Sequence, residues 1–133
     1  MIRNKIPDKN RALSLLRSAK SDLAFTLTIK LNDDSANTIA RNIYESFRML
    51  GEALLLSKGL QSQDHILPIN ELIKLKISTP RPMNILDNFR RLRHDINYYG
   101  YKATIVDAQD IINFAKSCFN IAYEEVKRII NEP

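Results

Sequence analysis

Apolar residues recur every three or four positions along most of this chain, which is the spacing of an amphipathic helix. No segment longer than a few residues alternates between apolar and polar positions, as a half-buried strand would. The pattern therefore predicts an all-α fold, an antiparallel bundle of four long helices plus one short helix. The five expected helices cover residues 8–29, 34–58, 68–76, 83–98 and 104–131.

Capping and breaking residues set the expected ends of these helices. Asp8 is a suitable N-cap for the first helix, and Asp34 or Ser35 for the second. Gly59 follows the second helix and is free to take the left-handed conformation that ends many helices. Gly51 lies inside that helix, where glycine costs about 1 kcal/mol relative to alanine. We therefore expect another element to approach the second helix closely at Gly51.

The last helix is expected to begin at a capping box, in which Thr104 and Asp107 satisfy each other's backbone N–H groups. The segment between the second and third helices, residues 60–68, reads as a loop that ends where Pro68 starts the short helix. The inner face of the last helix is expected to bury Ile111, Phe114, Cys118, Ile121, Ala122, Val126 and Ile129.

Composition and charge narrow the class of protein. The chain has 133 residues, 44% of them hydrophobic and 26% charged, which is typical of a single globular domain. We expect one domain over residues 1–133, in which residues 1–8 form an extended N-terminal segment. No apolar run approaches the length of a membrane span, and the polar start does not resemble a signal peptide. A single cysteine suits a reducing compartment, so we expect a cytoplasmic protein.

The net charge of +5 permits an acidic partner such as RNA, but does not require one. The candidate chemistry is concentrated in residues 88–101, "NFRRLRHDINYYGY", most of which belong to the fourth expected helix. A helical wheel places one apolar stripe on this helix, and this stripe is expected to be buried. Its members are Ile85, Phe89, Leu92, Ile96 and Tyr99.

An adjoining polar face of the same helix carries the residues that could act on a ligand. Arginine offers a planar fork of donors to phosphate oxygens, and histidine exchanges protons near neutral pH. Asparagine and tyrosine can hydrogen-bond a ribose or a base, and tyrosine can also stack on a base. Arg91 and Asp95 lie outside this face and are expected to pair with each other. The face comprises Arg90, Arg93, His94, Asn97 and Tyr98.

The alternative is that this face is only a solvated basic surface, on which the histidine makes local hydrogen bonds. The sequence leaves that alternative open. Outside this face we find no catalytic constellation. His65 stands beside Asp64 in a loop and is expected to cap or hydrogen-bond locally. Two histidines and one cysteine at unrelated spacings do not form a zinc site, and no phosphate-binding glycine loop is present. We therefore predict no metal and no cofactor.

Three segments resemble the HEPN domain superfamily, helical proteins of prokaryotic toxin systems and RNA-processing factors. "ARNIYESFRMLGEALLLSKGL" followed by "QSQDH" resembles the second helix of the family. "RRLRHDINYYGY" resembles the helix that bears the family's arginine motif, and "TIVDAQDIINFAKSCFNIAYEEV" resembles its closing helix. The resemblance implies a dimer in which the two motif helices meet across a two-fold axis and receive RNA.

In active members of this family, the motif is an arginine, a polar residue and a later histidine, and the activity is metal-independent RNA cleavage. Arg93 and His94 match the first two positions, and Tyr98 stands where the histidine is expected. Some members pair with a nucleotidyltransferase antitoxin that modifies a tyrosine near the motif, where this chain has Gly100 between two tyrosines. The residues implied in RNA or nucleotide binding are Arg90, Arg93, Asn97, Tyr98 and Tyr101.

Three functions follow from these observations and remain open at this point. The first is a homodimeric RNA- or nucleotide-binding protein, from a toxin–antitoxin or defence system, with weak or no cleavage. The second is an active endoribonuclease in which Arg93 stabilises the phosphate charge and His94 supplies acid–base catalysis, with Tyr98 as the third member of the catalytic set. The third is a helical protein that binds another protein and no nucleic acid.

Overall fold

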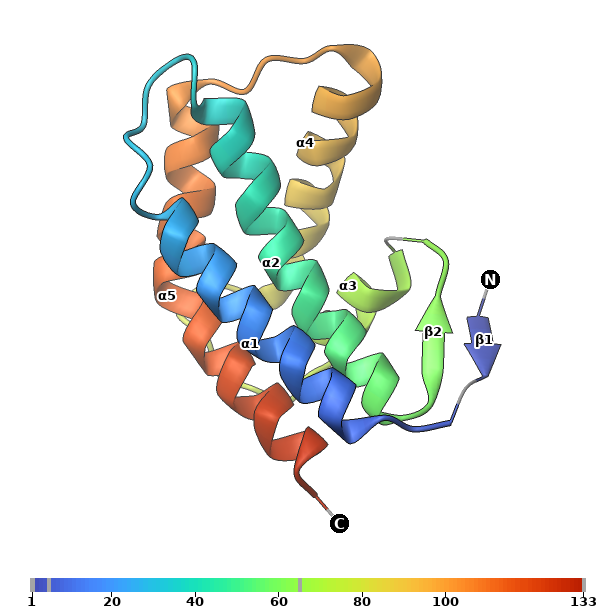
Figure 1. Ribbon diagram of the computed structural model, residues 1–133. Helices are drawn as coiled ribbons and strands as arrows, with labels where there is room; N and C mark the ends of the chain where they lie inside the picture. Colours follow the sequence, from blue (N-terminus) through green and yellow to red (C-terminus); the bar gives the residue numbers. More distant parts are fainter. Residues whose placement is uncertain (1, 5, 65, 133) are drawn as a thin grey trace.

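The structure is a computed structural model that describes residues 2–4, 6–64 and 66–132. Five helices pack together in it, and a short 3-10 turn precedes the fourth of them (Figure 1). The prediction of an all-helical bundle is confirmed. The helices are α1 (Lys9–Thr26), α2 (Ala36–Ser57), α3 (Ile66–Ile73), α4 (Leu86–Tyr99) and α5 (Ile105–Ile130), and the turn is Met83–Ile85.

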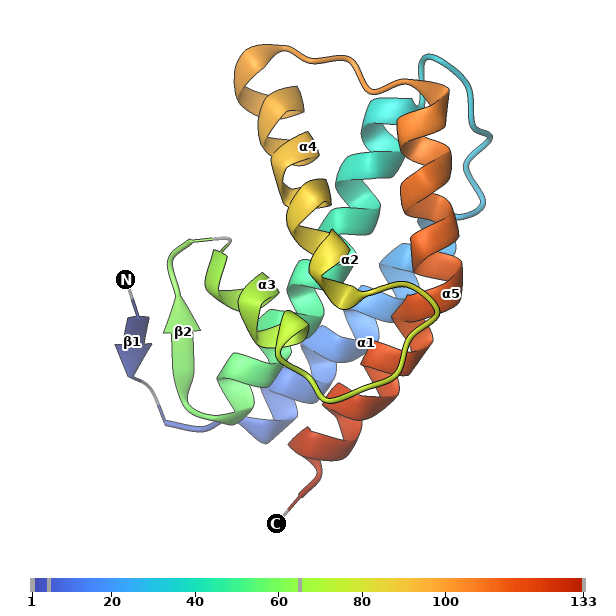
Figure 2. The same cartoon turned by 180° about the vertical axis from the view of Figure 1, so that it is seen from behind.

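The central element of the bundle is α2, which contacts all four other helices. Its two long neighbours, α1 and α5, also contact each other, whereas α4 packs mainly against α2. Seen from behind, a loop at the top of the view joins α4 to α5, and α2 is seen between them (Figure 2). Among the long helices, mainly α2 covers α4, so much of the surface of α4 is left exposed.

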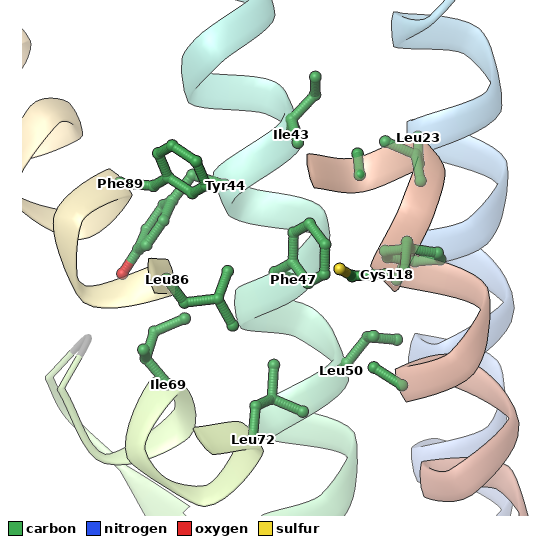
Figure 3. Packing of buried hydrophobic residues seen from close by; sticks show 14 of the residues in the cluster. Leu23, Ile43, Tyr44, Phe47, Leu50, Ile69, Leu72, Leu86, Phe89 and Cys118 are labelled. Carbon is green, nitrogen blue, oxygen red and sulfur yellow. The ribbon is translucent and has the colours of Figure 1, made fainter. Parts of the chain in front are cut away.

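The hydrophobic core lies around Phe47 of α2. Its ring centroid lies 5.3 Å from that of Phe114 and 5.2 Å from that of Phe119, both on α5. Phe89 of α4 reaches the same cluster, with its ring centroid 5.3 Å from that of Phe114. Cys118 is buried in this cluster, as the helical pattern predicts (Figure 3). No described helix is long and apolar enough to cross a membrane.

Local signals in the sequence set most helix ends as predicted. The Asp8 carboxylate accepts a hydrogen bond from the Arg11 backbone N–H at 2.9 Å, and Thr104 with Asp107 forms the expected capping box. Gly59 adopts a φ of 74°, the left-handed conformation expected after α2. Ser35 holds the N-cap position of α2, but its hydroxyl donates to the preceding loop instead of capping the helix.

The close approach predicted at Gly51 is confirmed. A Cβ atom placed on Gly51 would lie 2.1 Å from the carbonyl oxygen of Pro68. This distance is far below van der Waals contact, so only glycine allows the backbone of α3 to approach α2 at this point. Pro68 itself lies in the first turn of α3, where its missing N–H group breaks no helical hydrogen bond.

The segment between α2 and α3 differs from the prediction. Part of the expected loop is a strand, β2 (Leu60–Ser62), which pairs antiparallel with β1 (Ile2–Asn4). The helix α3 also begins at Ile66, before Pro68, and it ends at Ile73 instead of at residue 76. The prediction of a loop over residues 60–68 is therefore wrong at Leu60–Ser62 and from Ile66 onward. The two strands are three residues each and far apart in the sequence, so neither carries a readable alternating pattern. Residues 1 and 5 of the predicted extended segment lie outside the described residues.

Most residues of the predicted buried faces are buried, but Ile85, Leu92 and Ile129 are half-buried, and Tyr99 and Ile121 are exposed. On α4, Phe89 and Ile96 are buried. Tyr99, in contrast, is 76% exposed, because the covered strip of a helix that packs mainly against one neighbour is narrow.

On α5, Ile121 is 37% exposed, whereas Phe119 and Tyr123 are buried. Phe119 packs against Phe47 of α2, and Lys20 of α1 lies over the ring of Tyr123, so the buried face of α5 is wider than its predicted stripe.

Candidate functional site

The polar face of α4 is the candidate site, and it adjoins α2. Arg90 and Arg93 are half-buried along the α2 side, whereas His94, Asn97 and Tyr98 are exposed. Arg93 therefore lies at the border between the apolar stripe of α4 and the solvent. A half-buried arginine has fewer conformations than a solvated one, so its guanidinium is held ready for a ligand.

The acid partners of the arginines differ from the prediction. Arg91 pairs with Asp87, at 2.9 Å from Nη2 to Oδ2, and not with Asp95. The Nε of Arg90 donates to the other oxygen of the same carboxylate, also at 2.9 Å. An acid one turn before a basic residue is the more favourable order in a helix, which explains why Asp87 takes both arginines. The hydrogen bond from Arg90 is the largest influence that lowers the pKa of Asp87.

Arg93 is the member of this face whose charge is left uncompensated. Within residues 6–64 and 66–132, no carboxylate lies within ion-pair distance of its guanidinium. The charge of Arg90, in contrast, is partly neutralised by Asp87. A phosphate group would therefore find in Arg93 a cation that need not break an existing ion pair.

The helix α2 contributes residues to this site that the sequence analysis did not single out. Arg41 donates from Nη1 to the side-chain oxygen of Asn97 at 3.4 Å, which joins α2 to the exposed end of the α4 face. One and two turns further along α2 are Tyr44 and Arg48, and Arg48 is bound by Glu45 and by Glu52. The spacing of residues 41, 44 and 48 is the only signal of this face in the sequence.

Tyr44 lies between the two helices, and its ring extends from α2 toward α4 beside Phe89 (Figure 3). Burial raises the pKa of Tyr44 to about 12, and the positive charges of Arg93, Arg48 and Arg90 oppose that rise. Three guanidinium groups, from both helices, therefore act on one buried hydroxyl.

Exposed aromatic rings surround His94 at the C-terminal end of α4. The imidazole centroid lies 4.7 Å from the ring of Tyr98 and 5.5 Å from the ring of Tyr99. These two tyrosines are 67% and 76% exposed, so their ring faces are accessible to a planar ligand. Aromatic side chains of this kind stack on unpaired bases, each stack contributing about 1–3 kcal/mol.

Tyr101 lies apart from the other predicted site residues, in the loop between α4 and α5. Its hydroxyl donates to Oδ2 of Asp107 at 2.6 Å, and this hydrogen bond raises the pKa of Tyr101. Burial alone would raise the pKa of Asp107, but hydrogen bonds from Tyr101 and Thr104 lower it overall. Tyr101 thus extends the capping box of α5. The structure brings Arg90, Arg93, His94, Asn97 and Tyr98 together on one face.

In the part of the chain that the structure describes, no group of histidine, cysteine or carboxylate side chains could hold a metal ion. His65, expected to cap locally, lies outside the described residues. The chain matches no protein-family model, no curated protein and no solved structure.

Proposed function

We propose that this chain is a HEPN-like RNA-binding protein that acts as a homodimer and cleaves RNA weakly or not at all. The observation that carries the proposal is Arg93: it is half-buried against α2, and no acid pairs with it among the described residues. An arginine in this state binds a phosphate through charge-assisted hydrogen bonds with little loss of side-chain freedom.

The neighbours of Arg93 favour single-stranded RNA or a nucleotide over other anions. Arg41 adds a second guanidinium on the α2 side, held by Asn97. On the other side, Tyr98 and Tyr99 present exposed rings next to His94. Phosphate-binding arginines beside stacking rings are the combination that recognises unpaired nucleotides.

The weak-cleavage part of the proposal rests on Tyr98, which replaces the histidine of the family motif. A tyrosine hydroxyl keeps its proton at neutral pH, so it is a poor general base. The alternative is an active ribonuclease that uses Arg93 and His94. The exposure of His94 favours this alternative, because a substrate can reach the imidazole. A role in a toxin–antitoxin or defence system, with a nucleotidyltransferase partner, belongs to the same proposal.

Fluorescence anisotropy with a labelled single-stranded RNA tests the binding. We expect Arg93→Ala to weaken RNA binding about ten- to a hundredfold, because one charge-assisted hydrogen bond contributes roughly 1.5–3 kcal/mol. Arg91→Ala is the matched control, since Arg91 lies off the face and is bound to Asp87. His94→Ala should weaken binding less than Arg93→Ala does. Equal affinities for the wild type and Arg93→Ala would overturn the proposal.

A cleavage assay in EDTA separates the two forms of the proposal. Little cleavage by the wild type and a rise in Tyr98→His would support a binding protein with a degenerate motif. Strong wild-type cleavage that is lost in both Arg93→Ala and His94→Ala would support the ribonuclease alternative. Cleavage unaffected by either substitution would mean that this face is not catalytic.

The homodimer is tested separately, by light scattering at tens of micromolar protein. The exposed apolar side chains of Ile105 and Val106, at 42% and 77%, offer a contact in the first turn of α5 that leaves Tyr98 and Tyr99 accessible to bases. An isologous contact there would bring two copies of Arg93 toward one cleft. A monomer at these concentrations would remove the composite cleft from the proposal but leave the RNA-binding test unaffected.

A further inference from the structure

A second site is formed on a different part of the molecule, between α1, the C-terminal half of α2 and β2. Here a cavity of about 280 Å³ is lined by residues of those three elements, and none of the α4 face lines it. Its volume falls near the lower end of small-molecule pockets, which span roughly 300–1,000 Å³. The apolar part of the lining consists of Leu15, Leu55, Leu56 and Leu60.

Two opposite charges line the same cavity without pairing with each other. Arg11 extends from the first turn of α1, whose backbone is fixed by the Asp8 cap. Glu52 extends from α2, where one of its oxygens already accepts a hydrogen bond from Arg48. Within the described ranges, Arg11 forms no ion pair with any carboxylate. The cavity therefore offers one free cation and one carboxylate to a ligand.

The third polar group is Gln61 of β2, which also lines the cavity. Its side-chain oxygen is buried, and no donor from the described residues reaches it. Buried acceptors are nearly always hydrogen-bonded in proteins, and one without a partner is unfavourable. A rotation of the Gln61 side chain toward the cavity that it lines would let an N–H group of a ligand provide such a partner.

We propose that this cavity binds a small zwitterion with an apolar body, an apolar α-amino acid or a short apolar peptide. The carboxylate of the ligand binds Arg11, and its ammonium group donates to Gln61 and to Glu52. The leucine lining receives the apolar side chain. A phosphate-bearing ligand fits less well, because its charge would meet the carboxylate of Glu52. This site goes beyond the RNA-binding proposal and does not depend on Arg93.

The test is a titration of the full chain with L-leucine and with leucyl-leucine, followed by NMR shifts of backbone amides. We expect saturable shifts that are confined to α1, the C-terminal half of α2 and β2. The tighter of the two ligands identifies an amino acid or a peptide as the occupant. Leucinamide, which lacks the carboxylate, and N-acetyl-leucine, which lacks the ammonium group, should each bind at least about tenfold more weakly. No saturable shift at these residues, or equal binding of all four compounds, overturns the proposal.

Two substitutions assign the polar contacts. Arg11→Gln should weaken L-leucine binding about tenfold and abolish the preference for L-leucine over leucinamide. Lys9→Gln is the matched control, because Lys9 is an exposed cation in the same turn that does not line the cavity. Gln61→Met should weaken binding and raise the melting temperature of the free protein, since it removes the buried acceptor. Unchanged binding in both Arg11→Gln and Gln61→Met would overturn the assignment, and each variant's own melting curve shows that it is folded.

Discussion

The helices α2 and α4 lie against each other but differ in how much of each is covered. Thirteen of the 22 residues of α2 are buried, against three of the 14 residues of α4. Four helices contact α2, whereas α4 packs mainly against α2. Most side chains of α2 are therefore fixed by packing, and most side chains of α4 are available to a partner. For this reason the candidate chemistry lies on the less buried helix.

The arginines of the two helices show the same difference. Arg48 of α2 is enclosed by Glu45 and Glu52, one turn before and one turn after it. Arg93 of α4 lies at a similar boundary between core and solvent, but it has no acid partner in the described part of the chain. The charge of Arg48 is neutralised by ion pairs within α2. Arg93 keeps its charge available, and this makes it the stronger candidate for a ligand contact.

The largest expected effect is on the core beneath the two helices. Phe47→Ala should lower the free energy of unfolding by about 3–5 kcal/mol, because it leaves a cavity among fully buried rings. Phe89→Ala on α4 should cost less, about 3 kcal/mol or below, since Phe89 lies at the edge of the same cluster. Urea unfolding measures both values. A larger loss for Phe89→Ala would mean that α4 contributes more to the core than its burial indicates.

A smaller loss is expected at the contact between α2 and α3. Gly51→Ala should destabilise the protein by about 1–3 kcal/mol, although alanine is the better helix former by about 1 kcal/mol. The new Cβ would overlap the backbone of Pro68, which cannot rotate away as a side chain can. Gly100→Ala, at the end of α4, is the comparison. Its Cβ would meet no atom within 4 Å, so its cost of about 1–2 kcal/mol comes from the left-handed φ of 68° alone.

Thermal unfolding of the two glycine variants decides between these causes. If Gly51→Ala proves as stable as the wild type, α2 and α3 are not held in close contact. Gly100→Asn should recover part of the stability lost in Gly100→Ala, because asparagine tolerates the left-handed conformation.

Ionisation of the Tyr44 hydroxyl, which lies between the two helices, should lower the free energy of unfolding at high pH. Tyr44 has a pKa of about 12 in the folded protein and about 10 when unfolded. The folded state therefore keeps the proton longer, so its stabilising effect is complete below pH 10 and is lost as the pH rises from about 10 to 12. At pH 11 the loss should be roughly 1 kcal/mol relative to neutral pH. Denaturant unfolding at pH 9 and at pH 11 should show a smaller fall in Tyr44→Phe than in the wild type.

The smallest expected effect on stability is at the acid that holds two arginines of α4. Asp87→Asn should lower the free energy of unfolding by less than about 1 kcal/mol, because these ion pairs are largely solvated. The pKa of Asp87 is lowered in the folded protein, so its contribution is present above pH 4 and disappears as the pH falls further. RNA affinity should rise, since the substitution removes a negative charge and releases Arg90. Weaker RNA binding in Asp87→Asn would contradict the RNA-binding proposal.

The sequence by itself determined the features that depend on near neighbours in the chain. The Asp8 cap, the box of Thr104 with Asp107 and the turn at Gly59 form from residues within a few positions of each other. The apolar stripes of α2 and α5 are readable because each stripe continues over several turns. The close contact at Gly51 was also predictable, because an interior helical glycine needs a reason to be there.

Only the tertiary structure decided the features that join distant segments or depend on which neighbour covers a helix. The pairing of β1 with β2 and the hydrogen bond from Arg41 to Asn97 link residues that no local pattern connects. Tyr99 lies on the apolar stripe of α4, yet it is exposed because the packing of α4 is mainly against α2. A helical wheel gives the angle at which a side chain projects from its own helix. It does not show where the neighbouring helix α2 lies, and the packing against α2 decided which face of α4 was left accessible.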